Sequence, residues 1–150
     1  MSPLPPSMSD RDGKIWMDGQ LVDWRDAKIH VLTHGLHYGS CVFEGQRAYG
    51  GVVYKQREHH ERLHASANIL GFDIPHSVAE LDAACEEVLR RMNFRDAYVR
   101  PVAWRGSEMM GVSAQASKIH LALACWDWPA YFSPEARAKG KKVPRKGKAS

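Results

Sequence analysis

Apolar and polar residues alternate in several short stretches of this chain, and a helical spacing replaces the alternation in the middle. The stretch 15–24 has two apolar runs around Asp18-Gly19, and 41–54 has two more around Gly50-Gly51. Both pairs tolerate the positive φ of a two-residue turn, so each stretch predicts a β-hairpin. Two further strands are predicted at 97–104 and 119–126.

Two helices are predicted between the second hairpin and these later strands. The first spans 57–70 and ends before Gly71, the expected C-cap. His60, Leu63, Ala67 and Leu70 fall at helical spacing, and the last three form an apolar stripe. The second begins at Ser77, where Ser77-Val78-Ala79-Glu80 fits a capping box. Its apolar face consists of Val78, Leu81, Ala84, Cys85, Val88, Leu89 and Met92.

The order of two hairpins, two helices and two strands favours an α+β fold, with an antiparallel sheet and two helices packed on one face. The 150 residues fit one domain, which we place at 14–136. Residues 1–13 contain prolines and no apolar run, and we expect them to be disordered. Residues 137–150 form a basic tail with the same expectation.

Charge is distributed unevenly along the chain. Seven of the 21 Lys and Arg residues lie in 137–150, which leaves 14 basic against 17 acidic residues in the rest. The body therefore has no basic surface of the kind that nucleic-acid binding needs. We predict no membrane segment either, because no apolar run approaches the roughly 18 residues of a spanning helix.

The three cysteines lack the spacing of a metal or redox site. Cys41, Cys85 and Cys125 are widely separated within apolar patterns. Buried free thiols in a reducing compartment are the expected state, and we predict a cytoplasmic protein.

One short motif formally matches a zinc-hydrolase signature, and zinc hydrolysis is the less favoured alternative to a partly solvated helix. His60-Glu61-Arg62-Leu63-His64 matches H-E-x-x-H, which on a helix places two imidazoles on one face beside a general base. A cation at Arg62 disfavours a dication there, and no third ligand stands out. His30, His34 and His37 lie earlier in the chain, in a predicted loop, where packing and hydrogen bonding are more common than metal binding.

Three arginines are candidates for binding anions. Arg62 on the first helix can meet a phosphate with paired hydrogen bonds, or it is an exposed helix residue. Tyr98 and Arg100 share one face of their strand by its period of two, as suits a carboxylate or an ordinary solvent face. Arg47 joins them from its own strand.

A longer resemblance covers about 15–140. Its most specific part is HGLHYGSCVFEGQRAY at 34–49, and the other matching pieces are IWMDGQLVDWRDAKIHVLT, ERLHASA, AYVRPVAWRG, MMGV and WDWPAYFSPEA. In order and spacing they resemble the branched-chain amino-acid aminotransferases, fold-type IV enzymes that use pyridoxal phosphate. The resemblance implies transfer of an amino group from leucine, isoleucine or valine to 2-oxoglutarate, by a homo-oligomer built from dimers.

The resemblance also implies roles for individual residues. Arg62 falls at the family's cofactor-phosphate arginine. The apolar pocket for the substrate side chain falls at Tyr38, Phe43, Trp128 and Tyr131. The polar positions that handle carboxylates fall at Arg47, Tyr98 and Arg100. Val112 falls on a loop that reaches the neighbouring subunit's active site.

The family's Schiff-base lysine has no counterpart among the nine lysines of this chain. In the family it lies beyond the segment that ends here in WPAYFSPEARAKG. We therefore expect a truncated form corresponding to the N-terminal small domain, with no catalytic residue of its own and no activity alone. A non-catalytic small-molecule-binding or interaction domain is the other reading.

Overall fold

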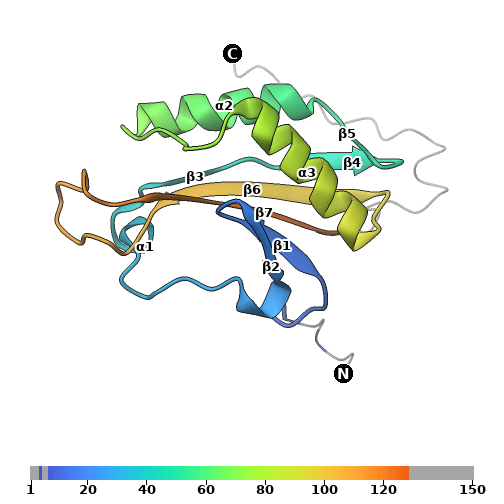
Figure 1. The fold of residues 1–150 in the computed structure, drawn as a ribbon, viewed down its shortest axis with the longest axis horizontal. Coiled ribbons are helices and arrows are strands. Elements are labelled where there is room, and N and C mark those ends of the chain that lie inside the picture. Colours follow the sequence, from blue (N-terminus) through green and yellow to red (C-terminus); the bar gives the residue numbers. More distant parts are fainter. Residues whose placement is uncertain (1–3, 5–6, 129–150) are drawn as a thin grey trace, which may run out of the picture.

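The computed structural model describes residues 4 and 7–128. The protein folds into a seven-stranded antiparallel sheet with two long helices on one face (Figure 1). The predicted α+β class is confirmed. The strands are β1 (Lys14–Met17), β2 (Gln20–Asp23), β3 (Cys41–Phe43), β4 (Gln46–Tyr49), β5 (Val52–Val53), β6 (Ala97–Arg105) and β7 (Ile119–Asp127). The helices are α1 (His34–Tyr38), α2 (Gln56–Ile69) and α3 (Val78–Met92), with a 3-10 turn, η1 (Trp24–Asp26).

The sheet has the order β2-β1-β7-β6-β4-β5, and β3 also pairs with β6. Both predicted hairpins are present as β1–β2 and β4–β5. Their turn residues have positive φ, 51° and 93° at Asp18 and Gly19 and 59° and 85° at Gly50 and Gly51. These values explain why the turn sequences predict the hairpins correctly.

The predicted strand from Cys41 to Tyr49 is interrupted in the structure. Its parts β3 and β4 pair with β6 in one continuous register, and the break falls at Glu44 and Gly45. Glu44 lies opposite Pro101, which has no N–H to donate, although the Glu44 N–H still donates to the Pro101 carbonyl over 3.0 Å. The proline therefore interrupts the ladder without changing its register.

Both long helices carry the predicted end signals, with two differences. The Ser77 hydroxyl accepts a hydrogen bond from the Glu80 N–H at 3.1 Å, but the Glu80 carboxylate contacts His76 instead of completing the capping box. At the end of α2, Gly71 has a φ of 81° and follows Leu70. Leu70 was expected on the apolar face but is 44% exposed, because the helix has ended at Ile69.

The core lies between the helices and one face of the sheet. Every second residue of the two central strands faces it, so that Val99 pairs with Cys125 and Ala103 with Leu121. The helices contribute their apolar residues to the same cluster, with Leu63 and Ala67 from α2 and Leu81, Ala84, Cys85, Val88 and Leu89 from α3. The period of each element thus selects its buried face.

Other expectations need correction. His34 and His37 lie on α1, a short helix, and not in a loop. Cys41 is exposed, whereas Cys85 and Cys125 are buried free thiols. In the described part of the N-terminal segment, the Trp24 indole N–H donates to the Met8 carbonyl, and the disorder expected for residues 1–13 stays a prediction.

The chain beyond Trp128 lies outside the described residues, and so does the predicted basic tail. Within the described part, no helix is both long enough and apolar enough to cross a bilayer.

We predict that Ser77→Ala lowers the free energy of unfolding by about 0.5–2 kcal/mol, because it removes the acceptor at the start of α3. Chemical denaturation monitored by circular dichroism measures the change. Ser66→Ala inside α2 is the matched control, and we expect it to have little effect or to stabilise slightly. Equal losses in both variants would contradict a capping role for Ser77.

Candidate functional site

The face of the sheet away from α2 and α3 carries the side chains that the core leaves out. On β6 these include Tyr98, Arg100 and Trp104, which pair across the ladder with Trp126, Ala124 and His120 of β7. On the other side of β6, Arg47 of β4 pairs with Tyr98. We call this surface the open face.

Two arginines and four aromatic rings meet at one end of the open face. We call this group the arginine–aromatic cluster: Phe43, Arg47, Tyr98, Arg100, Trp126 and Trp128. The Tyr98 ring centroid lies 4.8 Å from those of Trp126 and of Trp128. Arg100 donates to the Tyr98 hydroxyl from Nε at 3.1 Å and from Nη2 at 2.7 Å.

Cation–π contacts complete the cluster. The Arg100 guanidinium carbon lies 4.1 Å from the centroid of the Phe43 ring. The Arg47 guanidinium carbon lies 5.7 Å from the centroid of the Trp128 ring. Arginines held flat against aromatic rings keep their N–H edges available for a ligand.

Gly45 allows the cluster to form at the strand break. A Cβ atom at this position would lie 2.4 Å from the Tyr98 hydroxyl oxygen. Any side chain would therefore push away the tyrosine that holds Arg100. The glycine of the sequence motif has a packing role that the sequence alone does not reveal.

Arg47 has a hydrogen-bonding group without a partner. Its Nη1 is buried and makes no hydrogen bond within the described part of the chain. A buried unpaired donor on a charged group costs about 1–3 kcal/mol or more, which a bound acceptor would recover. A carboxylate oxygen has the charge and acceptor capacity for this position.

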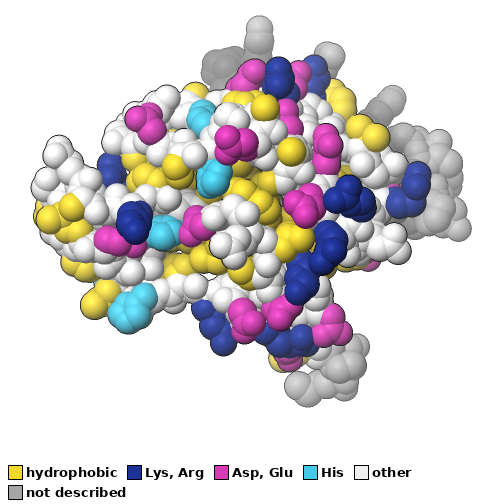
Figure 2. Space-filling model, viewed as in Figure 1, with side chains coloured by type: hydrophobic (Ala, Val, Ile, Leu, Met, Phe, Trp, Pro, Cys, Tyr) yellow, Lys and Arg dark blue, Asp and Glu magenta, His cyan; other side chains and the backbone are white. Residues whose placement is uncertain are grey.

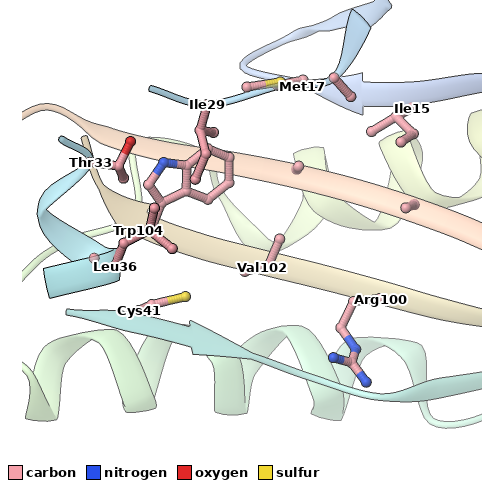
Figure 3. Close-up of a pocket in the computed structure, with 13 residues that line it drawn as sticks. Ile15, Met17, Ile29, Thr33, Leu36, Cys41, Arg100, Val102 and Trp104 are labelled. Carbon is pink, nitrogen blue, oxygen red and sulfur yellow. The ribbon is translucent and has the colours of Figure 1, made fainter. Parts of the chain in front are cut away.

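An apolar cavity of about 350 Å³ lies beside the cluster on the open face (Figure 3). Arg100 lies at one end of it, and Trp104 and Leu36 lie at the other. Its remaining walls are mostly aliphatic and include Ile15, Ile29, Val102, Ala122 and Ala124. Apolar side chains also reach the surface in a band between the helix layer and the β1–β2 hairpin (Figure 2).

Arg62 lies apart from this cluster, on α2. Its Nε and Nη2 donate to the two carboxylate oxygens of Glu44, each over 2.7 Å. The side chain is 66% exposed and lines a hollow of about 330 Å³ with Tyr54, Lys55, Glu58 and His59. The hollow is open to solvent and contains cationic side chains, as a phosphate site requires.

Tyr38 and Val112 form a third group, linked by His34. The imidazole of His34 is 3% exposed and lies 4.4 Å from the Tyr38 ring, centroid to centroid. Its Nε2 is 3.1 Å from the carbonyl of Gly111, the residue before Val112. Val112 itself is 85% exposed. Tyr131, also predicted in the substrate pocket, lies outside the described residues.

The H-E-x-x-H residues belong to the helix layer. His60 is fully buried, and its Nδ1 is 2.6 Å from the Asp82 carboxylate on α3. Burial lowers the pKa of His60, although the Asp82 carboxylate opposes this change. No group of three or more His, Cys, Asp or Glu side chains is arranged to hold a metal in residues 4 and 7–128.

The far end of the open face carries a polar cluster that the sequence did not predict. His120 is 2.6 Å from Asp18 through Nδ1 and 3.1 Å from Glu108 through Nε2. Burial disfavours the charged imidazole, but hydrogen bonds to these carboxylates outweigh burial and raise the pKa of His120. His120 thus joins Asp18 of the β1–β2 turn to Glu108 of the loop between β6 and β7.

For two residues of the site region, the strand pattern alone indicates the face of the sheet on which the side chain lies. Trp126 is two residues from Trp128, so it was a candidate for the same face. Glu44 follows Phe43 and therefore points to the opposite face, toward α2. The ladder register needed to connect either residue to its partners is not readable from the sequence.

Comparison with known proteins identifies the family of this chain. The Amino-transferase class IV family matches residues 41–149, and the chain belongs to this family. A branched-chain-amino-acid aminotransferase from Pseudomonas aeruginosa is 48% identical over 141 residues, which are 91% of this chain and 46% of that relative. The corresponding Escherichia coli K12 protein is 44% identical over 131 residues, 84% and 42% of the two chains.

Solved structures agree with these relatives. The crystal structure of Escherichia coli branched-chain amino acid aminotransferase matches with a TM-score of 0.78 and 42% identity, covering 84% of this chain and 43% of that chain. The T.th. branched-chain amino acid aminotransferase with pyridoxamine 5'-phosphate matches with a TM-score of 0.78 and 40% identity over the same shares. This chain therefore spans less than half the length of these relatives.

We predict that His120 makes stability depend on pH. The pKa of His120 in the folded protein is raised above its ordinary value of 6.5. Its contribution to the free energy of unfolding is therefore fully present below pH 6.5 and is lost as the pH rises through the folded-state pKa. His120→Gln should therefore flatten the decline of the unfolding free energy above pH 6.5, measured by urea denaturation. Ser66→Ala on α2, which removes no titratable group, should leave the decline unchanged, and an unaltered profile in His120→Gln would refute the assignment.

Proposed function

We propose that this chain is the N-terminal, substrate-recognising part of a branched-chain amino-acid aminotransferase. The substrates in this proposal are leucine, isoleucine or valine with 2-oxoglutarate, and the cofactor is pyridoxal 5'-phosphate. The family membership supports it, and so do the names of the relatives. The observation that carries it is the unpaired Nη1 of Arg47 beside the Trp128 ring, in a cluster whose Arg100 lines an apolar cavity.

One binding region must accept both an aliphatic side chain and the side-chain carboxylate of glutamate. The open face offers surfaces for both, since its cavity is apolar while Arg47 and Arg100 lie on the same face. We assign Arg47, Tyr98 and Arg100 to carboxylates, and Tyr38, Phe43, Trp128 and Tyr131 to the apolar wall. Packing against the rings limits the arginines' motion and lowers the entropy cost of binding.

Arg62 is our candidate for holding the phosphate of the cofactor. Its side chain is largely exposed, is fixed on one edge by Glu44, and lines a hollow with Lys55 and His59. These features fit a phosphate monoester. Once bound, the cofactor supplies the electron sink that stabilises the substrate carbanion.

We assign no lysine of this chain to the Schiff base with the cofactor. Of the lysines that the structure describes, Lys14 pairs with Asp23 and Lys55 pairs with Glu58, while Lys28 and Lys118 are exposed. The Glu58 carboxylate raises the pKa of Lys55, which is opposite to what a nucleophilic amine needs. We therefore limit the role of this chain to recognition.

Dimer-based assembly and a cytoplasmic location complete the proposal. Val112 is 85% exposed, and we assign it to contact with a neighbouring subunit. The buried free thiols of Cys85 and Cys125 are in keeping with a reducing compartment.

We predict that the chain binds 4-methylvalerate, the ligand named for one structure of the T.th. enzyme, more tightly than 4-methylpentan-1-ol. The two probes share the branched chain, but only the acid carries a negative charge that can form an ion pair with Arg47. NMR titration, followed at the indole N–H signals of Trp126 and Trp128, measures both affinities. We expect a difference of about tenfold or more.

Arg47→Gln should remove this preference, whereas Arg91→Gln on the exposed side of α3 should retain it. Equal binding of acid and alcohol by the unaltered chain would refute the recognition role.

We also predict that added pyridoxal phosphate forms no specific covalent linkage with this chain. Borohydride reduction followed by peptide mapping should find only scattered, substoichiometric labelling of exposed lysines. Pyridoxal phosphate that survives dialysis and labels one lysine stoichiometrically would contradict the limit to recognition. Bovine serum albumin treated in the same way gives the background of nonspecific labelling.

A further inference from the structure

Glu44 has a buried carboxylate, and both of its oxygens accept hydrogen bonds. Its side chain is 7% exposed, Oε1 accepts from Arg62 Nε, and Oε2 accepts from Arg62 Nη2. His59 Nδ1 also lies 2.8 Å from Oε2. A buried charge persists only when it is paired in this way. The hydrogen bond from Arg62, more than any other interaction, lowers the pKa of Glu44.

This pair leaves one edge of the Arg62 guanidinium available. Glu44 occupies the edge formed by Nε and Nη2, and Nη1 makes no hydrogen bond to any residue that the structure describes. The guanidinium lines the hollow between Tyr54 and His59. A planar fork held along one edge can present its remaining donors in a constant direction.

Glu44 is itself held by the sheet. Its N–H donates to the Pro101 carbonyl at the interruption between β3 and β4. The alternation of the strand turns its side chain toward α2, while Phe43 and Arg47 face the opposite way. The same short segment therefore fixes groups on both faces of the sheet.

We propose that Glu44 is a positioning residue that fixes the Arg62 guanidinium so that its Nη1 end meets a phosphate monoester. This inference rests on the proposed function, in which Arg62 holds the cofactor phosphate. Glu44 touches neither the phosphate nor the substrate and acts through Arg62. Without Glu44, the long arginine side chain would have to lose rotamer freedom when the anion binds.

The sign of a charge-removing substitution separates positioning from simple electrostatics. A carboxylate near an anion site repels the anion, so neutralising it should strengthen phosphate binding if charge alone matters. If Glu44 positions Arg62, neutralising Glu44 should instead weaken phosphate binding. Glu58 lines the same hollow and pairs with Lys55, and among the described residues it forms no hydrogen bond or ion pair with Arg62. Glu58→Gln therefore removes an equal charge nearby and is the matched control.

The experiment titrates the 150-residue chain with inorganic phosphate while recording the arginine Nε–H signals by NMR, with Arg62 assigned from Arg62→Lys. We expect a sharp Arg62 signal that shifts with phosphate. In Glu44→Gln the free Arg62 signal should broaden, and phosphate should bind about 2- to 10-fold more weakly. In Glu58→Gln, binding should be unchanged or stronger.

Glu44→Asp is the second variant and decides the outcome if Glu44→Gln does not fold. It keeps the charge but is one methylene too short to engage both guanidinium nitrogens, so it should also weaken phosphate binding. Equal or tighter binding in the Glu44 variants would overturn the positioning role while leaving the Arg62 assignment intact. No response of Arg62 to phosphate in the unaltered chain would instead overturn the phosphate-binding part of the proposed function and, with it, this inference.

Discussion

The pairing of β6 with β7 determines where the side chains of this protein lie. Nine residues of each strand pair in one antiparallel register, which aligns Val99 with Cys125 and Tyr98 with Trp126. The first pair enters the core beneath the helices, and the second stands on the open face. A shift by one residue would exchange these faces, burying Arg100 and exposing the core. The core and the candidate site are therefore fixed by the same constraint.

The interruption between β3 and β4 connects the two faces. Pro101 removes one donor from the ladder, and Gly45 leaves space for the Tyr98 hydroxyl. At this point Glu44 turns toward Arg62 on α2, while Arg47 turns toward the open face. A local loss of sheet regularity thus positions two separate arginines that we propose to bind anions. This arrangement would be difficult to build on an uninterrupted strand carrying a larger residue in place of Gly45.

The described residues supply the features of molecular recognition. Aromatic rings, an unpaired guanidinium donor and an apolar cavity share the open face, and a second arginine lines a separate hollow. In the proposed function these groups bind and orient a substrate, whereas transamination also requires an amine that moves a proton. In the proposed enzyme, recognition and proton transfer belong to different parts of the protein. This chain spans less than half the length of the relatives that it matches.

The sequence by itself determined the local elements. The turn pairs and the Ser77 cap have short-range physical causes, so they were readable without tertiary contacts. Only the tertiary structure decided that Gly45 accommodates Tyr98 and that Glu44 pairs with Arg62, since 53 and 18 residues separate those partners. It also buried His60 against Asp82 instead of leaving it available to a metal. These contacts depend on strand register and helix packing, which a local pattern does not encode.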